Sequence, residues 1–152
     1  MTVERSFVMI KPDAVQRGIV GEVISRFERK GLKLSAVKML QIDTKLARRH
    51  YGEHRGQPFY EPLIRYITSS PVIAMVIEGQ NAITIIRKLV GATDIEEALP
   101  GTIRGDLTIH SRSNIVHASD SRESADREIG NFFSENEILQ YEKDIDHWIY
   151  YE

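Results

Sequence analysis

The chain has 152 residues, of which 41% are hydrophobic and 28% charged, a composition typical of a globular protein and not of a disordered or fibrous one. Its 20 basic and 22 acidic residues give a net charge of −2, so no overall positive field favours nucleic acid or a membrane surface as a partner. The chain contains no cysteine, which excludes disulfides, cysteine-ligated zinc and thiol nucleophiles.

The pattern of apolar residues gives no sign of membrane insertion or export. The longest apolar run, Val72–Ile77, is far shorter than the roughly 20 residues that a membrane span needs. The first residues lack the apolar segment of a signal peptide, so a cytoplasmic protein is expected. No repeat or linker interrupts the sequence, and a single domain over residues 1–152 is predicted.

In the first half of the chain, short apolar runs alternate with helical spacing. The pattern predicts, in order, a strand over Ser6–Ile10, a helix from Asp13 to Gly31, a strand over Leu34–Ile42, a helix from Asp43 to His50 and a helix over Tyr60–Thr68.

The second half continues this alternation but contains one long segment without a period. A strand is predicted over Val72–Ile77, a helix over Ala82–Gly91, an irregular segment over Ala92–Arg112, a strand over Asn114–His117, and a final helix opened by a capping box of Asp120 and Glu123. Loops as long as the irregular segment are usually functional. The order of elements predicts an α+β fold with a ferredoxin-like βαββαβ core, an antiparallel sheet with helices packed on it.

One local string matches a zinc-peptidase pattern. His50-Tyr51-Gly52-Glu53-His54 has the H-x-x-E-H spacing, but Gly52 interrupts the helix and arginines crowd the would-be cation. The interpretation as two surface histidines near a helix end is therefore favoured. P-loop, Rossmann, esterase and RNA-binding signatures are absent from the sequence.

His117 is the strongest candidate for catalysis. It lies at the end of a predicted strand and just before a capped helix, where a side chain can face a pocket beside free backbone N–H groups. A neutral imidazole is a competent nucleophile. Glu128 on the following helix could turn back to fix its tautomer, with Ser119 bridging the two. Taken singly, His117 has a plainer interpretation as a buried structural histidine, and Glu128 has one as a solvated helix carboxylate.

Two cations are also placed where a pocket could form. Arg104 lies in Pro100-Gly101-Thr102-Ile103-Arg104-Gly105-Asp106, a loop tightened by proline and glycine, and Lys11 directly follows the first strand. Either alone could be an ordinary surface charge.

Taken together, these residues resemble the nucleoside diphosphate kinase family over essentially the full chain. The motifs that carry the resemblance are Lys11-Pro12-Asp13, His50-Tyr51-Gly52-Glu53-His54 leading into Pro58-Phe59-Tyr60, Thr68-Ser69-Ser70-Pro71-Val72, the Pro100–Asp106 loop, and His117-Ala118-Ser119-Asp120-Ser121 with Glu123-Ser124-Ala125. The last string is highly specific.

The resemblance implies a two-step transfer of the γ-phosphate of a nucleoside triphosphate to a nucleoside diphosphate. His117 would attack through Nδ1 and become a phosphohistidine. Glu128, braced by Ser119, would accept from the other ring N–H, and Tyr51 would orient the histidine and the phosphate.

The resemblance also implies the nucleotide contacts. Lys11, Arg87 and Arg104 would bind phosphate, Thr93 would add a hydroxyl donor, and Asn114 with Lys11 would bind the ribose. Phosphoryl transfer depends mainly on positioning and charge stabilisation of this kind.

Three further expectations follow from the resemblance. Phe59 would stack on the base, which tolerates any nucleotide because every base has a π-face. Mg²⁺ would be held mainly by the nucleotide phosphates, with Asp120 near its water shell and no residue as a direct metal ligand. The family also implies a homo-oligomer, a hexamer in preference to a tetramer.

The sequence departs from the family pattern at three places, namely Asp94-Ile95, Ser113 and Ala14. The first lies near subunit contacts in the family, and none removes a group that the chemistry requires. A catalytically silent nucleotide-binding or regulatory module on the same fold is the main alternative, and the presence of Lys11 and His117 argues against it.

Overall fold

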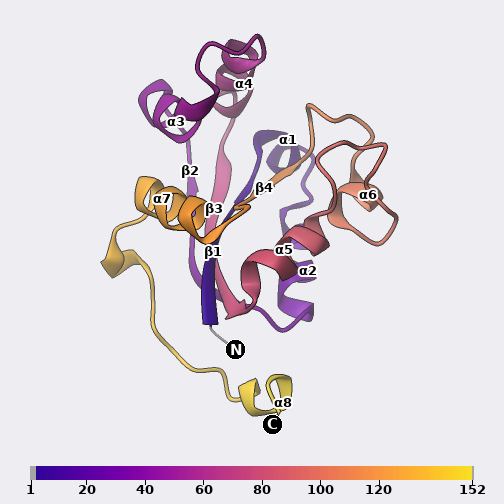
Figure 1. Ribbon diagram of the computed structural model, residues 1–152, viewed down its shortest axis with the longest axis vertical. Coiled ribbons are helices and arrows are strands. Elements are labelled where there is room, and N and C mark those ends of the chain that lie inside the picture. The colour runs from indigo at the N-terminus through magenta and orange to yellow at the C-terminus, as the bar shows by residue number, and fades with distance from the viewer. Residues whose placement is uncertain (1–2, 152) are drawn as a thin grey trace.

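Four strands pair into one antiparallel sheet in the computed structural model, which describes residues 3–151 (Figure 1). The strands are β1 (Val3–Ile10), β2 (Lys33–Leu40), β3 (Val72–Gln80) and β4 (Val116–Ala118), in the spatial order β2-β3-β1-β4. This order confirms the predicted ferredoxin-like core. Residues 1, 2 and 152 of the predicted domain lie outside the described residues.

Helices cover both faces of the sheet (Figure 1). The helices that share a core with one face are α3 (Thr44–His50), α4 (Tyr60–Ile67) and α7 (Arg122–Phe132). Those that share a core with the other face are α1 (Pro12–Gln16), α2 (Val20–Arg29), α5 (Ala82–Val90) and α6 (Ile103–Leu107). The remaining short elements are the 3-10 turns η1 (Gly52–His54) and η2 (Glu135–Glu137) and helix α8 (Asp146–Ile149).

Because both faces are covered, the central strand β1 is apolar at every position of its second half. Phe7 and Met9 point into the core beneath α7, while Val8 and Ile10 point into the core beneath α5. All four side chains are fully buried. The continuous apolar run that predicted a buried strand is thus explained by successive side chains pointing to opposite faces.

Two predicted segments differ from the structure. The helix expected over Asp13–Gly31 is two helices, α1 and α2, because Gly18 adopts a left-handed backbone with φ of +71° that a continuous helix cannot contain. The segment Ala92–Arg112 is not wholly irregular, since α6 lies within it. The Thr102 side chain caps α6 by accepting from the Gly105 N–H.

The predicted capping box of the last helix is wrong by one residue. Ser121, not Asp120, is the N-cap of α7, and its hydroxyl accepts from the Ser124 N–H at 3.1 Å. Asp120 is left at the cavity described below. Among helices formed by residues 3–151, none has the length and apolar character needed to cross a membrane.

Candidate active site

A cavity of about 920 Å³ lies beside the end of β1, along β4 and against the first turns of α7. The sequence-predicted site residues that line it are Lys11, Tyr51, Phe59, Arg87, Thr93, Arg104, Asn114, His117 and Glu128. Ser119, the remaining predicted residue, is fully buried behind Glu128. The fold therefore brings residues that are far apart in the sequence together around one cavity.

His117 and Glu128 form the centre of this cavity. The Nε2 atom of His117 on β4 lies 2.9 Å from Oε1 of Glu128 on α7. The Ser119 hydroxyl donates to the same carboxylate oxygen at 2.7 Å and accepts from the Phe7 N–H at 3.2 Å. The carboxylate is thereby tied to the central strand of the sheet.

This arrangement sets the tautomer of His117. Burial acts to raise the pKa of Glu128, but the hydrogen bonds and charge of His117 and the hydrogen bond of Ser119 outweigh it and lower the pKa. Glu128 is thus an ionised acceptor, and Nε2 of His117 must carry the proton that it receives. The lone pair of the neutral ring then lies on Nδ1, the atom a nucleophile needs.

Lys11 is a buried cation at the end of β1. Its Nζ donates to the Asn114 side-chain oxygen at 2.7 Å, and its backbone N–H donates to the Ile115 carbonyl at 2.9 Å. Burial and the nearby charge of Arg104 lower the pKa of Lys11 to about 7, with a smaller opposing effect from Asp13. An anion bound in the cavity would favour the charged form.

Arg104 and Arg87 converge on the same side of the cavity. Arg104 donates to the carbonyls of Val116 at 2.7 Å and Gly91 at 3.1 Å, and Arg87 donates to the Ala118 carbonyl at 3.1 Å. Burial and the charge of Arg87 lower the pKa of Arg104 to about 10, so it stays charged at neutral pH. Within residues 3–151, neither arginine lies at ion-pair distance from a carboxylate, and nor does Lys11. This concentration of uncompensated positive charge suits a polyphosphate.

Three further uncharged side chains that the sequence predicted for the site also line the cavity. Burial, with a contribution from the charge of Glu128, raises the pKa of Tyr51, which keeps its phenol protonated. That hydroxyl has no hydrogen-bond partner in the described part of the chain and is free to donate. Phe59 is 46% exposed at the cavity wall, and Thr93 lies just beyond α5.

The backbone is strained beside the site. Ile115, between Asn114 and the start of β4, has φ of +61° and is fully buried. A β-branched residue rarely adopts this left-handed conformation, and such strain clusters at functional sites. The strained Ile115 thus lies between Asn114, which accepts the hydrogen bond of Lys11, and β4, which carries His117.

His50 is the residue that the sequence interpretation placed wrongly. It is not a surface histidine, because it is only 4% exposed and its ring centroid lies 5.2 Å from that of His117. His54 instead faces Glu53 at 3.8 Å, so the H-x-x-E-H string gathers no three-ligand group. The helical spacing of Leu46, Ala47 and His50 on the inner face of α3 is the signal that could have indicated burial.

Comparisons with known proteins agree with this geometry. The sequence pattern of the family described as nucleoside diphosphate kinase matches residues 4–138. A nucleoside diphosphate kinase of Archaeoglobus fulgidus is 60% identical over 149 residues, covering 98% of this chain and 99% of that protein. One of Staphylococcus aureus is 57% identical over 147 residues, covering 97% and 99%.

Solved structures give the same result. A halophilic nucleoside diphosphate kinase from Halobacterium salinarum in complex with CDP superposes with a TM-score of 0.95 at 46% identity, covering 98% of this chain and 99% of that one. A transition-state mimic of nucleoside-diphosphate kinase from Borrelia burgdorferi with bound vanadate and ADP superposes with a TM-score of 0.92 at 41% identity, covering 98% of each.

Proposed function

This chain belongs to the nucleoside diphosphate kinase family, and on that premise we propose that it moves the γ-phosphate of a nucleoside triphosphate to a nucleoside diphosphate through a phosphohistidine on His117. The observation that carries the proposal is the 2.9 Å contact between His117 Nε2 and Glu128. Whenever the ring is neutral, this contact leaves the Nδ1 lone pair available beside three cations.

In the first half-reaction, Nδ1 of His117 attacks the γ-phosphorus and forms a P–N bond. The bond from that phosphorus to the β,γ-bridging oxygen breaks, and the nucleoside diphosphate leaves with the electron pair. Glu128, held by Ser119, stabilises the positive charge that develops on the ring. In the second half-reaction, a terminal oxygen of another nucleoside diphosphate attacks the phosphohistidine, the P–N bond breaks and His117 is restored.

The cations bind and orient the phosphates. Lys11, Arg87 and Arg104 offer N–H donors whose acceptors, in the described part of the chain, are neutral oxygens. Charge that moves toward the leaving group is therefore stabilised by groups already in position. Tyr51 and Thr93 supply hydroxyl donors.

The base and the ribose take the outer part of the cavity. Phe59 offers an exposed ring for stacking, which does not distinguish one base from another. The Asn114 amide, aligned by Lys11, would bind the ribose hydroxyl. The site would thus serve nucleotides of every base.

The residues present fit a magnesium ion carried by the nucleotide. Mg²⁺ keeps several waters and binds through phosphates and one or two carboxylates, and Asp120 lines the cavity as a carboxylate whose pKa is lowered, first by a hydrogen bond from Ser124. When bound, the ion would neutralise phosphate charge. Asp120 would hold a water of its shell.

We further propose a cytoplasmic homo-oligomer, with a hexamer favoured over a tetramer. β2 is an edge strand of the sheet, and its Val37 and Met39 side chains are exposed. An apolar edge of this kind is usually covered in the working form of a protein. Analytical ultracentrifugation of the purified protein would distinguish the two assemblies.

The test of the catalytic proposal is incubation with Mg²⁺ and γ-labelled ATP in the absence of an acceptor. We expect acid-labile, alkali-stable label that maps to His117, is lost in His117→Gln and is removed by any nucleoside diphosphate. A folded protein that binds nucleotide but takes up no label would instead be a silent binding module.

A further inference from the structure

The catalytic proposal leaves one buried imidazole unused. His50 on α3 is enclosed by the rings of Phe7, Tyr51 and Phe132, with centroids 4.5 to 5.7 Å away. Neither of its ring nitrogens has a hydrogen-bond partner among residues 3–151. Burial, and then the charge of His117, lower the pKa of His50 to about 3. The ring is neutral at physiological pH and has a free lone pair.

That lone pair lies beside two other potential ligands. One donor atom from each of His50, His117 and Glu128 lies within 4.8 Å of the others, and this is the sole group of its kind in the described chain. The three side chains come from α3, β4 and α7, so the fold brings them together although the sequence does not. Two imidazoles and one carboxylate form the ligand set of open zinc sites.

We propose that His50, His117 and Glu128 bind a divalent transition metal of the Zn²⁺ type, and that the bound ion switches off His117. Ligand atoms around a tetrahedral zinc lie about 3.4 Å apart, as follows from bonds of about 2.0–2.1 Å. The widest spacing in the group must shrink toward that value. If Nε2 of His117 is the ligand, its 2.9 Å contact with Glu128 must also widen as the ion enters. Rotation of the Glu128 carboxylate supplies the second movement.

The ion inhibits because a neutral imidazole has only one lone pair in its plane. If Nδ1 of His117 is the ligand, the nucleophilic atom is blocked directly. If Nε2 is the ligand, its proton must leave, and the neutral ring carries a proton on Nδ1 instead. In either case Nδ1 cannot attack phosphorus while the ion is bound.

The chemistry of the ligands separates this site from the magnesium that accompanies the nucleotide. Mg²⁺ demands oxygen ligands, whereas nitrogen donors favour zinc and its neighbours. The nearby charges of Arg127 and Lys11, which also lower the pKa of His50, oppose a cation. We therefore expect affinity in the micromolar range and no occupancy by Mg²⁺.

Zinc binding is tested without nucleotide, by competition with a chromogenic chelator. The wild-type protein should bind one equivalent of Zn²⁺, His50→Phe should weaken binding at least tenfold, and His54→Gln, in the neighbouring surface motif, should leave it unchanged. X-ray absorption of the wild-type zinc complex should detect two imidazole ligands, which keeps the test decisive should His50→Phe fail to fold. No uptake by the wild type, loss of binding in His54→Gln, or unchanged binding in His50→Phe would each overturn the site.

The inhibitory part rests on the proposed function and has its own readout. At free Zn²⁺ fixed by a metal buffer, labelling of His117 from γ-labelled ATP should fall as the site fills, and His50→Phe should need at least tenfold more zinc relative to its own zinc-free rate. Labelling that persists at saturating zinc would overturn the switch. Absence of label even without zinc would instead refute the phosphotransfer, while the binding measurement would still decide the metal site.

Discussion

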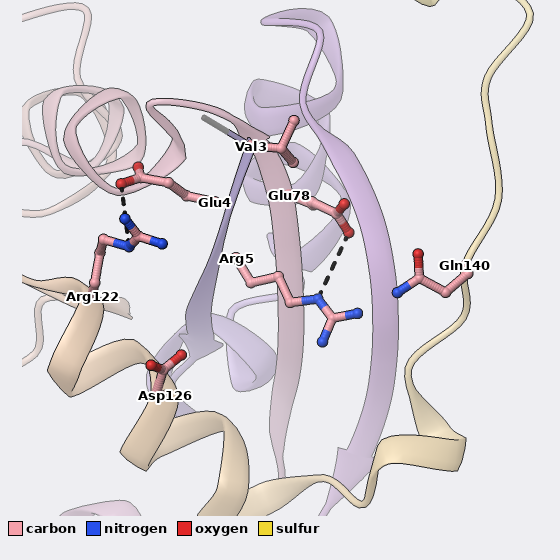
Figure 2. Close-up of a pocket in the computed structure, with 7 residues that line it drawn as sticks. All are labelled: Val3, Glu4, Arg5, Glu78, Arg122, Asp126 and Gln140. Carbon is pink, nitrogen blue, oxygen red and sulfur yellow. Dashed lines mark ion pairs between the residues drawn. The ribbon is translucent and has the colours of Figure 1, made fainter. Parts of the chain in front are cut away.

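The positive charge of arginine is compensated differently in two of the clefts of this molecule. In the smaller cleft, of about 360 Å³, Arg5 on β1 lies 3.9 Å from Glu78 on β3, and Arg122 on α7 lies 3.9 Å from Glu4. Figure 2 shows the two ion pairs. Each cation there has a carboxylate partner. In the cavity around His117, Lys11, Arg87 and Arg104 donate, within residues 3–151, only to amide and carbonyl oxygens.

The difference identifies which cleft is built for an anionic ligand. Paired charges cancel within the fold and leave little field for a ligand, whereas buried unpaired cations keep theirs at a cost in desolvation. The desolvation cost is visible at Lys11 and Arg104, because burial is the largest cause of the lowered pKa of each side chain. The larger cavity thus retains the electrostatic capacity that a bound polyphosphate uses.

The largest expected effect comes from removing a cation from the cavity around His117, and removal of a cation from the smaller cleft is the matched comparison. Lys11→Met should lower kcat/KM by about 10²–10³, because a preorganised charge on the transferred phosphate is lost. Its free energy of unfolding should change by no more than about 1 kcal/mol, since relief of desolvation offsets the lost Asn114 hydrogen bond.

The matched variant Arg5→Met should leave turnover unchanged and destabilise by less than about 1 kcal/mol, as expected for a partly exposed ion pair. Steady-state kinetics and urea unfolding measure both variants. Equal losses of activity in the two would refute the distinction drawn between the clefts.

A smaller loss is expected when the negative charge behind His117 is removed. Glu128→Gln keeps the size of the side chain but cannot stabilise positive charge on the ring, so the single-turnover rate of labelling should fall about 100-fold. Glu123→Gln, in the first turn of the same helix α7, is the control and should label at the wild-type rate. A Glu128→Gln protein that labels as fast as its control would exclude a role for the carboxylate.

The pH dependence of the large cavity should show opposite signs for activity and stability. Lys11 loses its proton near pH 7 in the free enzyme, so kcat/KM should fall by up to about tenfold per pH unit above that point. The unfolded chain keeps this proton up to about pH 10.4. It therefore binds more protons than the folded chain between these values, and the free energy of unfolding should rise with pH there.

Both trends should disappear in Lys11→Met, which retains every other titrating group. The pH profile of kcat/KM and urea unfolding from pH 7 to 9 measure them. If the alkaline fall in activity persists in the variant, it belongs to a different group.

The parts of the fold that sequence could predict are those where local pattern and tertiary packing agree. Apolar runs marked the strands, and specific motifs marked His117 and Lys11. Glu128 was indicated by its place on the helix that follows His117. Helix α6 was missed because five residues are too few to show a period, and it depends on the Thr102 cap and on the carbonyls that Arg104 binds.

His50 was misplaced for a related reason. A polar side chain on an apolar helix face is ambiguous until its neighbours are known, and Phe7 and Phe132 come from distant parts of the chain. The tertiary contacts, and not the local string, decide whether such a histidine is buried.

The smallest expected effect concerns the one apolar group that we assign to substrate. Phe59→Ala removes a ring that is already 46% exposed, so the lost stacking should be near the lower limit of about 1 kcal/mol. KM should therefore rise about fivefold for ADP, GDP and CDP alike, with little change in kcat, and Phe59→Tyr should restore it. A rise confined to one base would mean that Phe59 belongs to a pocket that distinguishes bases. The part of the cavity wall that contains Phe59 would then contribute specificity for the base in addition to affinity.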